Sequence, residues 1–155
     1  MRWVTREHPK IDRVACPWLI ARFIDDHPEF LFVPPADVRR VAEETGAIPF
    51  DVEGVRLTHE GLNCSFDALL DEYKLHDAVL DDIALIVRGA DTARLDLAPQ
   101  AAGLLAISLG LSRLFPNDHE MLAHGFVVYD ALHAWRRDVH GETHTWNPQR
   151  RAKLP

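Results

Sequence analysis

The stretch WVTREHPKIDRVACPWLIARFIDDHPEFLFV, residues 3–33, contains three segments with the patterns of regular secondary structure. Residues 3–5 predict a short strand. Residues 12–26 predict a helix, because apolar residues recur there every three to four positions. Residues 30–33 are a continuous apolar run between prolines, which is typical of a buried strand. The chain therefore begins with the order strand, helix, strand.

The next segments extend this order. Residues 36–45 predict a second helix, which Gly46 ends. Residues 48–52 and 55–59 alternate in polarity on either side of Gly54, and this pattern predicts a β-hairpin. The resulting order is that of a thioredoxin-like fold, although an ordinary α+β sandwich would show much the same order.

The second half of the chain predicts one helix after another. The expected helices cover residues 66–73, 77–88, 99–114 and 117–135. We therefore expect an α+β fold in which a small mixed sheet, residues 1–62, is followed by a helical half, residues 63–140. Residues 141–155 are expected to be a loose basic tail.

Composition narrows the class of protein. The 155 residues carry a formal net charge of −7, which makes binding to nucleic acid or to an anionic membrane unfavourable. The most apolar stretch, residues 97–111, is shorter than the roughly 20 residues of a membrane-spanning helix, and the N-terminus lacks the apolar core of a signal peptide. We expect a cytoplasmic protein whose two cysteines are unpaired, and the oligomeric state is left open.

Cys16 is the first candidate for chemistry. Expected at the start of a helix, its thiol would be favoured as thiolate by the positive end of the helix dipole. Arg13 would add positive charge, so the pair could serve as catalytic residues or bind an oxyanion. The alternative is that Cys16 is a small buried filler of the core.

A metal site is the second candidate. His59 and Cys64 border the loop after the expected hairpin, Asp91 follows a helix, and Asp130 lies on an apolar side of the last helix. With His59, Asp91 and Asp130 as ligands, and Cys64 or Glu60 as a fourth ligand or base, the set suits Zn, Mn or Fe. The alternatives are incidental loop residues, a helix cap at Asp91 and an ion pair at Asp130.

Eight segments resemble the bacterial chromate-resistance protein family, the domain shared with the C-terminal part of the chromate-operon regulator. They are residues 3–6, 10–20, 30–35, 46–51, 66–70, 86–92, 100–108 and 129–132. In that family the domain often follows an N-terminal DNA-binding region, in a regulator encoded beside a chromate efflux pump. This chain starts at the shared domain, so the resemblance implies no nucleic-acid binding without an extra domain.

Three functions remain open at this point. The first is a chromate-resistance domain that binds a metal ion or a small oxyanion, for sensing chromate or for its thiol-assisted detoxification with glutathione as a reductant. The second is a metal-dependent enzyme of unknown substrate that uses His59, Asp91 and Asp130. The third is a regulatory partner module without catalysis.

Overall fold

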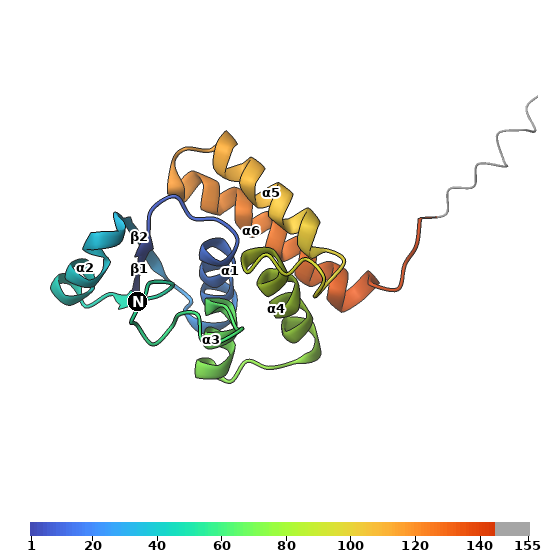
Figure 1. The fold of residues 1–155 in the computed structure, drawn as a ribbon, viewed down its shortest axis with the longest axis horizontal. Helices are drawn as coiled ribbons and strands as arrows, with labels where there is room; N and C mark the ends of the chain where they lie inside the picture. Colours follow the sequence, from blue (N-terminus) through green and yellow to red (C-terminus); the bar gives the residue numbers. More distant parts are fainter. Residues whose placement is uncertain (145–155) are drawn as a thin grey trace, which may run out of the picture.

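The computed structural model describes residues 1–144, so most of the expected tail lies outside the described residues. Three strands, β1 (Arg2–Arg6), β2 (Glu29–Val33) and β3 (Ile48–Pro49), form a parallel sheet in the order β2-β1-β3. The sheet lies between helix α2 on one side and helix α1 on the other, and the remaining helices pack beyond α1 (Figure 1).

The described chain also contains six α-helices and three shorter helical segments, joined by turns and loops. They are α1 (Asp12–Leu19), α2 (Val38–Thr45), α3 (Ser65–Tyr73), α4 (Ala78–Asp91), α5 (Ala101–Leu114) and α6 (Asp118–Ala134), with a 3₁₀ turn at Pro35–Asp37 and π-helical turns at Ile20–Ile24 and Trp135–Val139. None of the helices in residues 1–144 is both long enough and apolar enough to cross a membrane.

Strand β1 can be covered on both sides because both of its faces carry apolar side chains. Val4 packs against Val38 of α2, whereas Trp3 points the other way and joins the main core beside α1. Consecutive side chains of a strand point to opposite faces, so this short strand anchors both layers.

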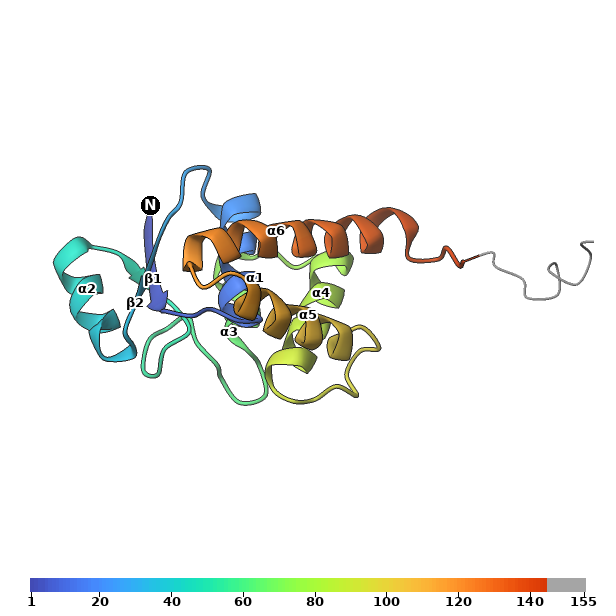
Figure 2. The ribbon, with the colours of Figure 1, turned by 90° about the horizontal axis from the view of Figure 1, so that it is seen from above.

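The main hydrophobic core contains residues from both parts of the chain. Trp3 and Trp18 belong to the expected α/β part, and Leu69, Ile83 and Tyr129 belong to the helical part, yet all five are buried in one cluster. Helix α1 is the centre of this packing, because it contacts α3, α4 and α6. Figures 1 and 2 show α1 enclosed between the sheet and these helices.

The expected hairpin and the expected mixed sheet are wrong. Phe50 and Leu57 form an isolated parallel bridge, and the residues between them are turns rather than strands. Every strand pair among the described residues is parallel, and the thioredoxin-like topology is not confirmed. Strand β3 ends at Pro49, and Asp51, whose carboxylate pairs with Arg6, has a positive φ of 49° that turns the chain out of the strand direction.

In place of the expected single helix over residues 12–26, the structure has α1 followed directly by a π-helical turn. Pro17 lies inside α1 rather than in its first turn. Proline has no N–H for the helical ladder, and the chain continues as the π-helical turn Ile20–Ile24.

Candidate metal site

Asp12 opens helix α1 from an unusual backbone position. The preceding residue, Ile11, has φ 43° and ψ −98°, a conformation that a β-branched residue rarely adopts. The hydroxyl of Tyr129, on α6, donates a hydrogen bond to the Ile11 carbonyl at 2.9 Å and so holds this turn. Backbone strain of this kind is characteristic of functional sites.

The Asp12 carboxylate is buried and held from three directions. The backbone N–H groups of Ser65 and Phe66, at the start of α3, donate to it at 2.8 and 3.1 Å. The thiol of Cys16, one turn further along α1, donates at 3.1 Å. The N-terminus of α3 therefore stabilises a negative charge at Asp12 and fixes its orientation.

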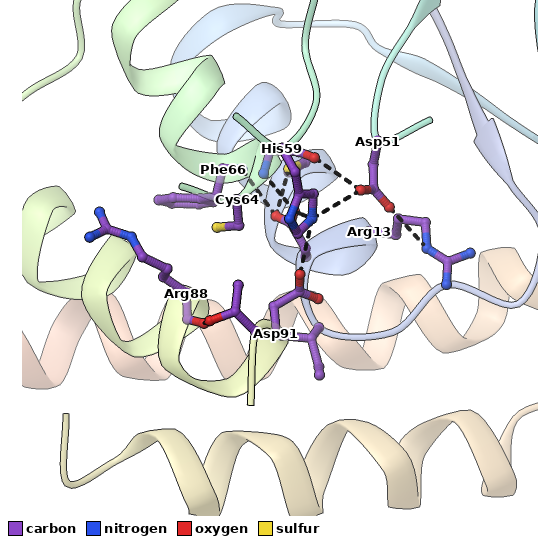
Figure 3. A network of polar contacts seen from close by, with 12 residues as sticks. Arg13, Asp51, His59, Cys64, Phe66, Arg88 and Asp91 are labelled. Atoms are coloured by element: carbon purple, nitrogen blue, oxygen red, sulfur yellow. Dashed lines mark hydrogen bonds and ion pairs between the residues drawn. The ribbon is translucent and has the colours of Figure 1, made fainter. Parts of the chain in front are cut away.

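His59 points its Nε2 atom into a group of three carboxylates (Figure 3). This atom lies 3.4 Å from Asp12 Oδ2, 3.4 Å from Asp51 Oδ1 and 3.1 Å from Asp91 Oδ2. The hydrogen bond with Asp12, together with the charges of the three carboxylates, raises the pKa of His59 to about 9. Without a metal, a proton on Nε2 is the cation at the centre of this group.

Asp91 is the last residue of α4 and faces the same point. Burial, and then the negative charge of Asp12, raise the pKa of Asp91 to about 7, although the nearby His59 opposes the shift. A carboxylate whose ionised form is disfavoured in this way is stabilised when a cation arrives.

Asp51 completes the group from the end of the sheet. Arg6 donates to Asp51 Oδ2 at 2.7 Å, Arg13 Nε lies 3.2 Å from the same oxygen, and the Ser65 hydroxyl donates to Oδ1 at 2.9 Å. Burial, followed by the charge of Asp12, raises the pKa of Asp51, and Arg6 opposes this rise.

These distances fit a metal ion. One ligand atom each of Asp12, His59 and Asp91 lies within 4.8 Å of the others. Ligand atoms bound at roughly 2.0–2.2 Å from an ion are about 2.9–3.5 Å apart in octahedral or tetrahedral geometry. The separations of His59 Nε2 from its three carboxylate neighbours fall in this range. One imidazole and several carboxylates suit Zn, Mn or Fe.

A cavity of about 310 Å³ opens beside this group. It is lined in part by Arg6, Asp51, Thr58 and His59. The Arg6 side chain is about one-third exposed, so its guanidinium reaches both Asp51 and solvent. A small ligand entering here would meet His59 and Arg6 first.

The structure brings together only part of the predicted metal set. His59 and Asp91 meet, but Asp130 is absent from the group. Its oxygens accept hydrogen bonds from the Arg22 guanidinium at 2.9 and 2.8 Å and from Trp18 Nε1 at 2.8 Å. The hydrogen bonds from Arg22 lower the pKa of Asp130, which is the behaviour of an ion pair.

Cys64 is buried at the N-terminus of α3 and acts as its cap. Its backbone N–H donates to Asp67 at 2.9 Å, and its sulfur accepts from the backbone of the same residue. Burial raises the pKa of Cys64 strongly. The sulfur therefore already has a hydrogen-bond donor at the start of α3.

Cys16 and Arg13 also lie elsewhere than expected. Because α1 begins at Asp12, Cys16 is in the second turn and has no access to the unpaired N–H groups of the helix start. Burial, and then the charge of Asp12, raise the pKa of Cys16 well above its usual value. Arg13 pairs with Asp51 rather than with the thiol.

Sequence reasoning missed two carboxylates, Asp12 and Asp51. An acidic residue in the first helical turn is common for electrostatic reasons alone, so Asp12 carried no special signal. Asp51 and Arg6 both lie where parallel strands end at their carboxyl side. Sites in α/β sheets often form at this edge, which was the available clue.

Comparison with known proteins identifies the family. The chain belongs to the family described as ChrB, C-terminal domain, whose sequence model matches residues 3–136. It is 35% identical over 151 residues to Protein ChrB of Cupriavidus metallidurans, an alignment that covers 97% of this chain and 42% of that protein. The chain thus spans less than half the length of this curated relative. No solved structure matches the chain. The resemblance to the chromate-resistance family is confirmed.

Proposed function

We propose that this chain is a metal-binding domain of the chromate-resistance family. It binds one divalent transition-metal ion through Asp12, His59 and Asp91, with Asp51 alongside. The observation that carries the proposal is the position of His59 Nε2, which lies 3.1–3.4 Å from oxygens of three carboxylates. Carboxylates gathered this closely need a cation, and the donor atoms are those of Zn, Mn and Fe sites.

The charges of the site support chromate as the ligand of the metal-loaded domain. Three carboxylates are balanced by Arg6, Arg13 and a protonated His59. Replacing the proton by a divalent ion changes the group from neutral to one net positive charge. A tetrahedral dianion is then attracted to a site that has no net charge to attract it in the metal-free state, despite the net charge of −7 on the chain.

The burial of the two thiols favours a role in binding chromate over a role in reducing it. Cys16 and Cys64 are both fully buried, and burial raises the pKa of each. Because the thiolate is the nucleophile and reductant, neither residue favours a thiol-assisted step with glutathione. The proposed role is therefore to sense or sequester the oxyanion.

The first experiment measures metal binding. Chelator-treated protein is titrated with Zn²⁺, Mn²⁺ and Fe²⁺ by calorimetry, and metal content is measured before and after treatment. We expect one ion per chain, and a loss of affinity of about 100-fold or more in His59→Gln and in Asp91→Asn. His76→Gln is the matched control, because His76 also lies between two carboxylates, Asp71 and Asp81, but on the surface.

The second experiment adds chromate. Metal-loaded protein is expected to bind chromate, metal-free protein is not, and Arg6→Gln weakens chromate binding while metal binding persists. If the wild type binds no metal, or if His59→Gln binds it as tightly as His76→Gln does, the proposed site is wrong. The adjoining cavity also favours a second candidate, a metal-dependent enzyme with a small substrate. Chemical change of the bound ligand would distinguish that candidate from a receptor.

A further inference from the structure

Helix α5 presents an uncharged face to solvent. Residues 97–112 contain no charged side chain. On the outward side of the helix, Ile107, Leu109 and Leu114 are 50%, 47% and 71% exposed. In Figure 1 this helix forms the upper edge of the molecule, with α6 beneath it and nothing above it. Exposed apolar residues in a continuous patch mark an interaction site.

Two glycines make the centre of this face flat. A Cβ atom built on Gly103 or on Gly110 would meet nothing within 4 Å. Each glycine costs about 1 kcal/mol of helix stability relative to alanine, and no contact within the described chain explains that cost. Glycines on an outer helix face allow another helix backbone to approach closely.

An apolar groove adjoins the flat strip that runs along α5 from Gly103 to Gly110. It has a volume of about 540 Å³ and runs between α5 and α6, where it is lined by Ile107, Leu111, Val128, Leu132 and Trp135 among others. The strip and the groove together form one surface, which we call the α5–α6 face.

We infer that the α5–α6 face binds a second copy of this chain, with the two α5 helices antiparallel. A two-fold axis between Ala106 and Ile107 would bring Gly103 of one copy opposite Gly110 of the other, so the flat strip is complementary to itself. Symmetric pairing of one patch with itself is the commonest form of oligomer.

Charge permits this partner. Two copies, each with a net charge of −7, repel each other at long range, and the uncharged residues 97–112 add no contact between like charges to that repulsion. Arg113 is exposed and forms no ion pair with any residue from 1 to 144. Antiparallel pairing brings it towards the exposed Asp96 at the other end of the partner's face, a carboxylate that already pairs with Arg94 of its own chain and would then be shared by two arginines.

The available area is that of a small interface. The 14 residues of α5 form a helix about 21 Å long. The adjoining ridge of α6, where Val127 is 65% exposed, roughly doubles its width. Two neighbouring helices of this length, each about 10 Å wide, present a projected area of roughly 400 Å². This is below the roughly 800 Å² per partner of a standard interface and suits a dimer that dissociates on dilution.

The experiment is sedimentation velocity of the chain from about 1 to 200 µM. We expect a monomer–dimer equilibrium, and Ala106→Glu should raise the dimer dissociation constant by more than about 30-fold, because two like charges meet near the axis. Ala36→Glu, the same change at an exposed residue beside α2, is the control and should leave the constant within about twofold.

A second variant separates loss of the interface from loss of folding. Ala106→Lys alone should also be monomeric, whereas an equimolar mixture of Ala106→Lys and Ala106→Glu should form heterodimers. Recovery in the mixture supports the inference. A wild type that stays monomeric at 200 µM, or a dimer that neither Ala106 variant weakens, overturns it.

Discussion

Replacing Asp91 by asparagine should stabilise the metal-free protein at neutral pH while removing a metal ligand. The pKa of Asp91 is raised from 3.8 to about 7, chiefly by burial and then by the charge of Asp12. The folded state therefore holds a proton on Asp91 more tightly than the unfolded state does. Between pH 4 and pH 7 the wild type loses stability as the pH rises, because ionisation is easier in the unfolded chain. Asparagine has no such proton to lose.

The expected change in the free energy of unfolding follows from the width of this pH range. From pH 5 to pH 7 the wild type loses up to about 2.7 kcal/mol at 1.36 kcal/mol per pH unit. Because the side chain of Asp91 is 18% exposed and interacts with the charges of His59 and Asp12, solvent screening and this coupling reduce the expected value to about 1–2 kcal/mol. A change of this size shifts the melting temperature by several degrees in a chain of this length.

The assay is urea unfolding of chelator-treated wild type and Asp91→Asn at pH 5 and pH 8. The variant's advantage should grow between the two pH values. Asp130→Asn is the control, because its carboxylate has a pKa lowered by hydrogen bonds from Arg22. Its removal should cost a little stability at both pH values. If Asp91→Asn is destabilised equally at pH 5 and pH 8, the account of the site's electrostatics is refuted.

Three further predictions follow from particular contacts. Metal affinity should rise up to tenfold per pH unit between pH 7.5 and 9, above the pKa of Asp91, because the pKa of His59 is about 9 and its proton must leave; titration in buffers of different ionisation enthalpy measures the release, and a flat profile would contradict it. Gly125→Ala should cost about 1–3 kcal/mol in urea unfolding, because its Cβ would lie 2.5 Å from Val14 Cγ1 between α6 and α1; an unchanged midpoint would refute this packing. Cys16 and Cys64 should react with iodoacetamide only after unfolding, and rapid modification of the native protein by mass spectrometry would show that they are accessible.

The sequence predicted the helices better than the sheet connections. The last four helices begin and end within a few residues of their expected bounds, because apolar periodicity and caps such as Asn117 mark them locally. The expected hairpin failed for a non-local reason. Residues 48–59 alternate in polarity, but Asp51 is bound by Arg6 and Arg13, which come from distant parts of the chain. Local alternation does not reveal such a partner.

The candidate site was predicted only in part, again because local sequence patterns do not show which distant residues come together. His59 and Asp91 stood out because each follows a regular element in a polar loop or at a helix end. Asp12, which opens α1, and Asp51, which follows β3, become significant only when the fold brings them beside His59. Asp130 was expected to need a metal because it lies on an apolar side of its helix, yet Arg22 neutralises it from the π-helical turn that follows α1.

The group around His59 differs from the other ion pairs of this protein because burial and mutual repulsion disfavour the ionised forms of two of its carboxylates, Asp51 and Asp91, although the protonated His59 offsets part of that cost. Surface pairs such as Arg94 with Asp96 join two exposed side chains, and each contributes little to the folded state. At the site, by contrast, the turn at Ile11 is strained and carboxylates are buried close together. Tyr129 and the N-terminus of α3 hold these features in place, although a core selected for stability alone would contain none of them. Strain, buried like charges and dedicated support occur together here, and a bound cation is what this combination stabilises.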